Sequence, residues 1–228
     1  MIARIVTAVL LLVAALSGCS TSSQAVLDTA LSLRGGGAID DPARLDARFR
    51  YLRVTRDGKV AVLALGYLDP HPQGQIEVWY SRQREVLRLQ NGRIAGASGL
   101  TTEWRRVTLA SAPDWVALLA SDAPVEWTRT RDVMPGYRYG IEDRLTLVRI
   151  APPGNSRLVG IEPQQLLWFE ERSAPQPDES ETLPPARYAL DARAAGDPVV
   201  YGEACLAKDL CFAWQRWPVA GQGTLGAR

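Results

Sequence analysis

The chain has 228 residues and a formal net charge of +1, with 26 lysines and arginines against 25 aspartates and glutamates. This near-neutral balance gives no electrostatic basis for binding nucleic acid, so we expect no nucleic-acid partner. The length suits one domain with a substantial core or two small ones, and no low-complexity segment divides the middle of the chain.

The amino terminus predicts a signal peptide that ends at a lipidated cysteine. Residues 1–19 read MIARIVTAVLLLVAALSGC, in which Arg4 precedes an apolar run from Ile5 to Leu16. A run of this length suits the h-region of a signal peptide, whereas a membrane-spanning helix needs about 20 residues. The quartet Leu16-Ser17-Gly18-Cys19 resembles the lipobox of bacterial lipoproteins. We therefore expect residues 1–18 to be removed and Cys19 to become the acylated first residue.

Acylation at Cys19 would fix where the protein works. Each buried methylene contributes about 0.8 kcal/mol, and stable anchoring needs at least two acyl chains. Ser20, beside the lipidated position, resembles the residue found in lipoproteins that are sorted to the outer membrane, whereas aspartate there would indicate retention in the inner membrane. We expect the protein to be anchored on the periplasmic face of the outer membrane.

Residues 19–38 are expected to form the lipidated terminus and a tether, with a helix from about Ser23 to Arg34 that three glycines end. Residues 39–228 are expected to form a single β-rich domain. Asp57-Gly58 and Asn91-Gly92 are the strongest kind of short-range hairpin signal. The second turn pairs Leu89 with Ile94 and Gln90 with Arg93, which predicts one apolar face and one solvated face. The segments expected as strands are 49–55, 59–67, 76–81, 85–90, 125–132, 137–150, 166–173, 187–194, 198–205 and 211–217.

A short helix is expected over 111–120, with Ser111 as a possible cap, Pro113 in the first turn and Asp114 near the positive end. The acidic, proline-rich stretch 174–186 predicts an exposed loop between strands. The sequence therefore predicts a mainly β fold, either an antiparallel curved sheet or a partly open β-barrel, with one or two short helices.

Cys205 and Cys211 are expected to form a structural disulfide, because an even pair this close oxidises in the periplasm. Across a hairpin, Leu206 would then pair with Leu210 and leave a three-residue loop. A redox-active pair would more often show the tighter Cys-x-x-Cys spacing.

The sequence contains few groups suited to catalysis. His71 is the one histidine and lies between two prolines in a stretch typical of a surface turn. The two cysteines are expected to bind each other, which leaves too few ligands for a zinc site. No catalytic residue, metal or cofactor is predicted, and we expect the protein not to be an enzyme.

Aromatic residues are the other chemical resource, with 7 tryptophans and 7 tyrosines along the strands. Most of these rings are expected to fill a β core, but an exposed one could stack on the apolar face of a sugar. If Ile76, Val78 and Tyr80 face inward, Trp79 points outward; by the same alternation, either Trp214 or Gln215 is exposed. Trp79, Trp104 and Trp214 are the candidate surface for a ligand or a partner protein.

Two stretches carry a resemblance to a known family. Residues 51–69 (YLRVTRDGKVAVLALGYLD) and 76–104 (IEVWYSRQREVLRLQNGRIAGASGLTTEW) are similar to the YjbF/GfcB lipoproteins of exopolysaccharide and group 4 capsule operons. The matching features are the lipobox, the hairpin that ends near Gly66-Tyr67, Trp79, the Asn91-Gly92-Arg93 turn, and Gly99-Leu100 with Trp104. The resemblance implies an outer-membrane lipoprotein of largely β structure, encoded beside a periplasmic partner and an outer-membrane β-barrel. It supplies no catalytic residues.

Three functions remain open at this point. The first is a non-enzymatic accessory lipoprotein that assists polysaccharide assembly or export by binding the glycan or the export machinery. The second is a lipid- or lipoprotein-binding module, because a half-open β shell can hold acyl chains. The third is a glycan hydrolase or lyase, which requires two carboxylates about 5–10 Å apart in a cleft. A continuous apolar cavity would favour lipid, and a polar, aromatic groove would favour sugar.

Overall fold

The computed structural model describes residues 40–175, 182–194 and 197–219. The signal peptide, Cys19, the tether and the helix expected over Ser23 to Arg34 all lie outside the described residues. Residues 176–181 of the loop predicted over 174–186 also lie outside the described residues. The described residues on either side of them belong to the connection between two strands, as predicted.

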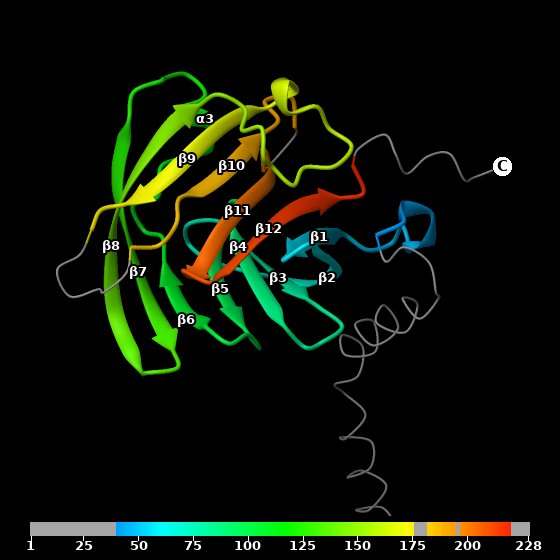
Figure 1. Cartoon of the computed structure of the whole chain (residues 1–228), viewed down its shortest axis with the longest axis horizontal. Helices are drawn as coiled ribbons and strands as arrows, with labels where there is room; N and C mark the ends of the chain where they lie inside the picture. Colours follow the sequence, from blue (N-terminus) through cyan, green and yellow to red (C-terminus); the bar gives the residue numbers. More distant parts are fainter. Residues whose placement is uncertain (1–39, 176–181, 195–196, 220–228) are drawn as a thin grey trace, which may run out of the picture.

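Within the described residues, twelve antiparallel strands form one closed barrel (Figure 1). Each strand pairs with its neighbour in sequence, and β1 pairs with β12 to close the ring. The strands are β1 (Tyr51–Arg56), β2 (Lys59–Asp69), β3 (Ile76–Tyr80), β4 (Val86–Gln90), β5 (Arg93–Ser98), β6 (Glu103–Thr108), β7 (Val125–Met134), β8 (Arg138–Ile150), β9 (Leu167–Ser173), β10 (Ala186–Leu190), β11 (Val199–Ala207) and β12 (Leu210–Trp217).

Helical structure in the described residues is limited to three short segments: η1 (Pro42–Arg44), α3 (Trp115–Leu118) and η2 (Pro163–Gln165). The helix expected over 111–120 is confirmed but covers only α3. Its N-cap is Asp114 and not Ser111, because the Asp114 carboxylate accepts hydrogen bonds from two backbone amides of the helix. The Ser111 hydroxyl instead donates to the carbonyl oxygen of Thr128 at the start of β7.

The predicted mainly β, antiparallel fold is confirmed, and the sheet closes completely. Five residue pairs join β1 to β12, from Tyr51↔Trp217 to Thr55↔Ala213. β5 was implied only by the Asn91-Gly92 turn, and β6 is the strand that neither a turn nor alternation indicated, since its EWRRVT lacks clear alternation. It pairs with β5 at one position, Ala97↔Trp104, and its register with β7 shifts between Trp104 and Arg106.

Both predicted hairpins are confirmed. Asp57 and Gly58, and likewise Asn91 and Gly92, have the positive φ angles that a two-residue hairpin turn requires. The second turn pairs Gln90 with Arg93 and Leu89 with Ile94, as expected. The solvated face predicted for this hairpin is wrong, because Gln90 and Arg93 are 4% and 3% exposed.

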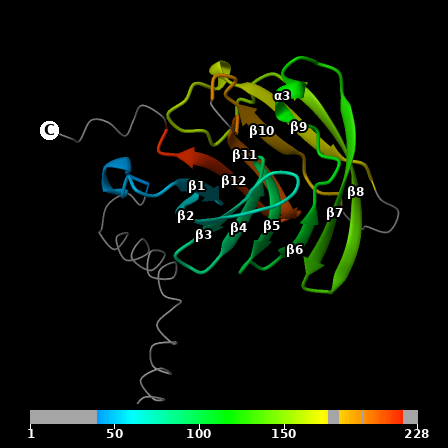
Figure 2. The ribbon, with the colours of Figure 1, turned by 180° about the vertical axis from the view of Figure 1, so that it is seen from behind.

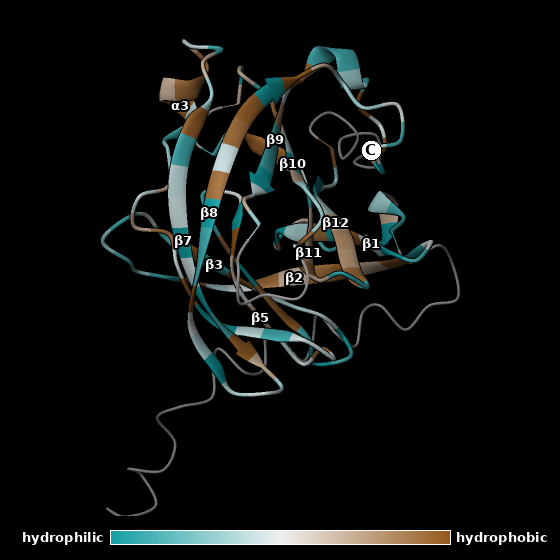
Figure 3. Cartoon of the chain, turned by 60° about the vertical axis from the view of Figure 1, so that its left-hand side comes forward, coloured by the Kyte–Doolittle hydropathy of each residue, from teal (hydrophilic) through white to brown (hydrophobic). Residues whose placement is uncertain are grey.

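The barrel interior is packed with large side chains. About eight strands already give an interior just wide enough for side chains to fill, and diameter grows with strand number. Here one cluster of buried apolar residues takes members from all twelve strands and from α3, including Trp79, Trp104, Trp115 and Trp214. Hydrophobic and hydrophilic residues alternate along β8, as Figure 3 shows.

Loops cover parts of the outer surface. Leu45 and Phe49, from the segment before β1, pack against a cluster of Tyr51, Val62 and Trp217. The β8–β9 connection covers a second outer cluster that contains Trp168 and Tyr201. Figure 2 shows the first of these segments, in blue, beside β1. Strands in these regions are therefore buried on both faces.

Gly202 of β11 lets the backbone approach the indole of Trp214 on β12. The two residues are paired across the ladder, and a Cβ at Gly202 would lie 2.4 Å from Cζ2 of the Trp214 ring. No real Cβ contact is that short, so any side chain here must displace a buried ring.

We predict that Gly202→Ala lowers the free energy of unfolding by about 1–3 kcal/mol, the usual cost of overpacking a core. Urea unfolding followed by tryptophan fluorescence measures it. Gly154→Ala is the matched control, because a Cβ at Gly154 meets nothing within 4 Å. Equal urea midpoints for the two variants would show that the Trp214 ring can move aside.

Candidate functional site

The two ends of the barrel carry different chemistry. The β4–β5 turn, α3 and the segment before β11 lie at one end, which we call the α3 end. The β1–β2, β3–β4 and β11–β12 turns lie at the opposite end, which we call the mouth. A pocket opens at each end.

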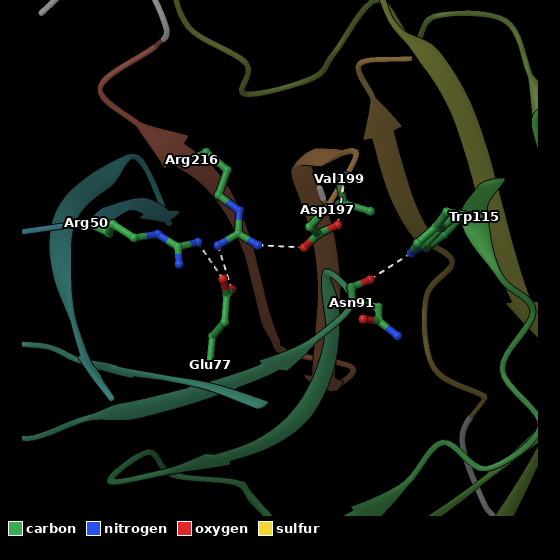
Figure 4. Close-up of polar contacts among 7 residues, drawn as sticks. All are labelled: Arg50, Glu77, Asn91, Trp115, Asp197, Val199 and Arg216. Atoms are coloured by element: carbon green, nitrogen blue, oxygen red, sulfur yellow. Dashed lines mark hydrogen bonds and ion pairs between the residues drawn. The ribbon is translucent and has the colours of Figure 1, made fainter. Parts of the chain in front are cut away.

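A chain of ion pairs crosses the α3 end (Figure 4). Glu77 of β3 accepts hydrogen bonds from Nη2 of Arg50 at 2.7 Å and from Nη1 of Arg216 at 2.5 Å. Nη2 of Arg216 also donates to Oδ2 of Asp197 at 2.7 Å. Both guanidiniums lie over the ring of Trp79, at 5.9 and 5.5 Å. β3, β12 and the segments before β1 and β11 are thereby joined over one tryptophan.

The β4–β5 turn is held between α3 and β11 (Figure 4). The carbonyl oxygen of Asn91 accepts a 2.7 Å hydrogen bond from Nε1 of Trp115. Gly92 lies against Val199, where a Cβ would come within 2.4 Å of the Val199 side chain. The backbone N–H of Val199 donates to Oδ1 of Asp197 at 3.0 Å. The turn is therefore a fixed wall and not a free hairpin tip.

α3 inserts two side chains into this end of the barrel. Trp115 and Leu118 are buried in the interior cluster. The Trp115 ring lies 5.8 Å from Phe169 and 5.1 Å from Tyr188, in tilted contacts. Such aromatic pairs contribute beyond their buried area, so α3 is fixed by packing despite its short length.

Arg93, directly after the turn, is the most unusual residue of this end. Its guanidinium stacks on the Trp115 ring at 3.7 Å and lies 5.5 Å from the Trp127 ring. Nε and Nη2 are enclosed and make no hydrogen bond to any of the residues that the structure describes. Desolvation by burial lowers the pKa of Arg93, and the charge of Glu171 only partly opposes that shift.

A second set of buried charges lies deeper in the barrel. Asp143 accepts hydrogen bonds from Arg129 at 2.8 Å and from Arg131 at 2.8 and 3.0 Å. Both guanidiniums lie over the Trp104 ring, at 4.6 and 5.1 Å. Burial alone would raise the pKa of Asp143, but the two arginines outweigh burial and hold it below its usual range. Glu171 lies 3.6 Å from Arg129, and its burial raises its pKa.

The pocket at the α3 end, which we call the α3 pocket, has a volume of about 380 Å³. This volume falls within the range of about 300–1,000 Å³ that is usual for small-ligand sites. Amide, carboxylate, guanidinium and indole groups all line it. The lining residues that carry these groups are Gln73, Gln90, Asn91, Arg93, Asp114, Trp115 and Asp197.

The pocket at the mouth, which we call the mouth pocket, has a volume of about 340 Å³ and a different lining. Its wall is largely aliphatic and aromatic, and includes Val54, Leu63, Leu87 and Phe212. Charged and amide groups also line it, from Arg56, Asp57, Lys59, Gln83 and Glu85. This pocket suits an apolar ligand better than a sugar.

The tryptophans predicted as a surface lie in the interior. Trp79, Trp104 and Trp214 are 0%, 1% and 2% exposed, and all three belong to the interior cluster. The predicted outward direction of Trp79 is wrong, because Glu77 and Trp79 form the inward face of β3. The prediction that either Trp214 or Gln215 is exposed is also wrong, since Gln215 is 1% exposed.

The Cys205–Cys211 disulfide is confirmed, and the two residues are opposite each other in the β11–β12 hairpin. The loop predicted around it is wrong in detail. Leu210 pairs with Ala207 and not with Leu206, because a register shift falls between Cys205 and Ala207. Cys19, the predicted lipidation site, lies outside the described residues.

His71 lies exposed in the β2–β3 connection, and its Nδ1 is 2.9 Å from Nε2 of Gln90. In the part of the chain that the structure describes, no group of three or more His, Cys, Asp or Glu side chains could hold a metal ion. No helix there is long and apolar enough to cross a bilayer.

Sequence reasoning missed Arg93 and Trp115 as site residues. Arg93 was noted only as the partner of Gln90 in a hairpin, on the face expected to be solvated. One sequence signal bears on the burial of this face: the segment WVAL, which follows a capping aspartate, is apolar enough to cover it. Nothing in the sequence indicates that α3 and the Asn91-Gly92 turn meet.

Comparisons with known proteins agree with the resemblance noted in the sequence. The family described as "Group 4 capsule polysaccharide lipoprotein gfcB, YjbF" matches residues 43–178, more than half of the chain. The fold is similar to the crystal structure of the hypothetical lipoprotein YmcC from Escherichia coli K12, with a TM-score of 0.52 and 18% sequence identity. That similarity covers 75% of this chain and 84% of the other, and at this identity it concerns the fold alone. Among curated proteins, none matches.

We predict that Asp143→Asn destabilises the fold by about 3–5 kcal/mol at pH 7, because it breaks a buried ion cluster. The folded pKa of Asp143 lies below its unfolded value of about 3.9. The cluster therefore stabilises the fold above that pH, and its contribution falls as the pH drops through the folded pKa. Urea unfolding of both proteins from about pH 7 to pH 2 should show their difference shrinking at the acid end.

Glu142→Gln is the matched control, because Glu142 is the adjacent carboxylate and its side chain is 59% exposed. It should change stability by no more than about 0.5 kcal/mol. A difference between wild type and Asp143→Asn that stays constant down to the acid end would contradict the ion-cluster explanation.

Proposed function

Because the chain belongs to the group 4 capsule polysaccharide lipoprotein family, YjbF/GfcB, we propose that it is a non-enzymatic accessory protein of capsule or exopolysaccharide assembly and export. The protein binds the glycan, and acyl chains on Cys19 hold the protein at the membrane. The outer membrane, periplasmic face, is the location that Ser20 favours.

The α3 pocket is the observation that carries glycan binding. Sugars present hydroxyl groups around an apolar ring face, so their sites combine donors and acceptors with aromatic surface. The α3 pocket supplies acceptors in Asp114 and Asp197, amides in Gln73 and Asn91, and the indole of Trp115. Its walls are fixed by the Trp115–Asn91 hydrogen bond and by the contact of Gly92 with Val199. A fixed wall lowers the entropy cost of binding a flexible glycan.

Binding to an acyl chain is the second candidate, and the mouth pocket is the observation that favours it. Against it, the interior cluster draws on every strand, so large apolar side chains of the described residues occupy the barrel interior that a lipid carrier would leave open. A pocket of about 340 Å³ confined to the mouth supports the binding of a small apolar group more than the carriage of a lipid.

A hydrolase would need a free acid and base in the pocket. Asp114 caps α3, and Asp197 binds Arg216 and the backbone of Val199, so both carboxylates already accept hydrogen bonds. Burial raises the pKa of Asp197 against the opposing charge of Arg216. A raised pKa suits a general acid, and the experiment below therefore includes a test for cleavage.

We expect the acylated protein in detergent micelles to bind the surface polysaccharide purified from the same cells, and to leave its chain length unchanged after prolonged incubation. Biolayer interferometry measures binding and size-exclusion chromatography measures chain length. Palmitate is the competing ligand for the mouth pocket. Binding of palmitate without binding of polysaccharide would favour the lipid function, and shortened polysaccharide would establish the hydrolase.

We expect Cys19→Ala to move the protein out of the membrane fraction and to reduce surface polysaccharide. Ser20→Asp keeps the lipidated cysteine and should relocate the protein to the inner membrane in a sucrose gradient. Ser22→Ala is the matched control that leaves both signals intact. Normal surface polysaccharide with an unanchored Cys19→Ala protein would contradict the anchored-accessory proposal.

The partner proteins implied by the family resemblance, an outer-membrane β-barrel and a periplasmic export protein, fit the same role. A glycan held at the membrane surface can be passed to either one. Crosslinking in outer membranes followed by mass spectrometry identifies which of them contacts this chain.

A further inference from the structure

Arg93 differs from every other buried charged residue that the structure describes. Seven such residues are buried: Glu77, Arg93, Arg129, Arg131, Asp143, Glu170 and Glu171. Each of the other six has an ion pair within 4 Å. Arg93 has none in the described ranges, and two of its three guanidinium nitrogens are enclosed without a hydrogen bond.

The described residues compensate this charge only in part, through the Trp115 ring and distant carboxylates, and not by an ion pair. A buried ion without a partner costs several kcal/mol, and leaving its donors unsatisfied adds to that cost. Glu171, Asp114 and Asp197 act on Arg93 through space, yet burial still outweighs them and lowers its pKa. Each of the three has its own contacts: Glu171 with Arg129, Asp114 with the α3 backbone, and Asp197 with Arg216. An anion from outside would therefore be attracted to Arg93.

The α3 pocket offers the route by which such an anion reaches Arg93. Arg93 lines this pocket, and Nη1 is not among its enclosed atoms. We propose that the α3 pocket binds a sugar residue that carries a carboxylate, with the carboxylate on Nη1 of Arg93 and the sugar hydroxyls on Gln73, Asn91 and Asp114. This inference rests on the proposed glycan-binding function and names the class of sugar.

A carboxylate fits this site better than a phosphate. One guanidinium without an ion pair compensates one negative charge, whereas a phosphate group brings up to two. Asp114 and Asp197 also line the pocket, and they would repel a second negative charge. The Trp115 ring lies 3.7 Å from the guanidinium carbon, so packing restricts Arg93 before the ligand arrives.

The test uses the acylated protein in detergent micelles, labelled with ¹⁵N, and follows the indole N–H signal of Trp115. Sodium D-glucuronate should shift this signal saturably and leave that of Trp217, in the outer cluster, unchanged. D-Glucose and inorganic phosphate should bind at least about tenfold more weakly, because neither combines one carboxylate with hydroxyls. Arg93→Met should lose at least about tenfold in glucuronate affinity.

Arg105→Met is the matched control, since the Arg105 side chain is 61% exposed on β6 and lies outside the pocket. Val116 lines the pocket and is 67% exposed, so its substitution should not impair folding. At low salt, Val116→Lys should raise glucuronate affinity and Val116→Glu should lower it, each about two- to fivefold. If Arg93→Met does not fold, the comparison of the two Val116 variants tests the inference in its place.

Equal glucuronate affinity in wild type and Arg93→Met would overturn the inference, as would equal affinity in the two Val116 variants. A stronger response to phosphate or to glucose would overturn the assignment of the ligand. If wild type and Arg93→Met bind the native polysaccharide and its carboxyl-reduced form equally, the proposed function stands and this inference fails. If the wild-type protein does not bind the polysaccharide at all, the proposed function itself fails.

Discussion

Closure of a twelve-strand sheet into a ring is the constraint on which the rest of this structure depends. A ring of this size encloses more space than aliphatic side chains fill readily, and an empty core forfeits dispersion contacts. The chain fills that space with four tryptophans, with α3, and with arginines whose guanidiniums lie over the indole rings. The four tryptophans of the interior cluster and the arginines beside them thus follow from the barrel diameter.

The same constraint explains why charges are buried and why one of them lacks a partner. Arg129, Arg131 and Asp143 fill interior volume as a hydrogen-bonded unit, so their burial is compensated. Arg93 lies at the edge of that packing, close to two indoles, where no carboxylate of the described residues comes within ion-pair distance. The contact with Trp115 leaves the charge of Arg93 without an ion pair in the described part of the chain, which is why we assign that charge to a ligand.

Local turn chemistry made parts of the fold predictable. Asp57-Gly58, Asn91-Gly92 and the cysteine pair each determine structure within a few residues, and the structure confirms all three. The orientation of Trp79 was not predictable, because the alternation in IEVWY placed the apolar residues Ile76 and Val78 inward. In the structure Glu77 points inward, with Trp79, and pairs there with Arg50 and Arg216. These two arginines are 27 and 139 residues from Glu77 in the sequence, so local alternation does not reveal them. Burial of Gln215 likewise depends on a distant loop, through two hydrogen bonds to the Val159 backbone.

Asp40, the first described residue, contacts both strands of the closing seam. Its carboxylate accepts a hydrogen bond from Arg53 of β1, and its carbonyl oxygen accepts one from the Trp217 indole of β12. A pull on the chain from its amino-terminal side is therefore shared between these two strands. The segment that leads into the barrel is thus tied to the two strands whose pairing closes the ring, so moving Asp40 would disturb both of them.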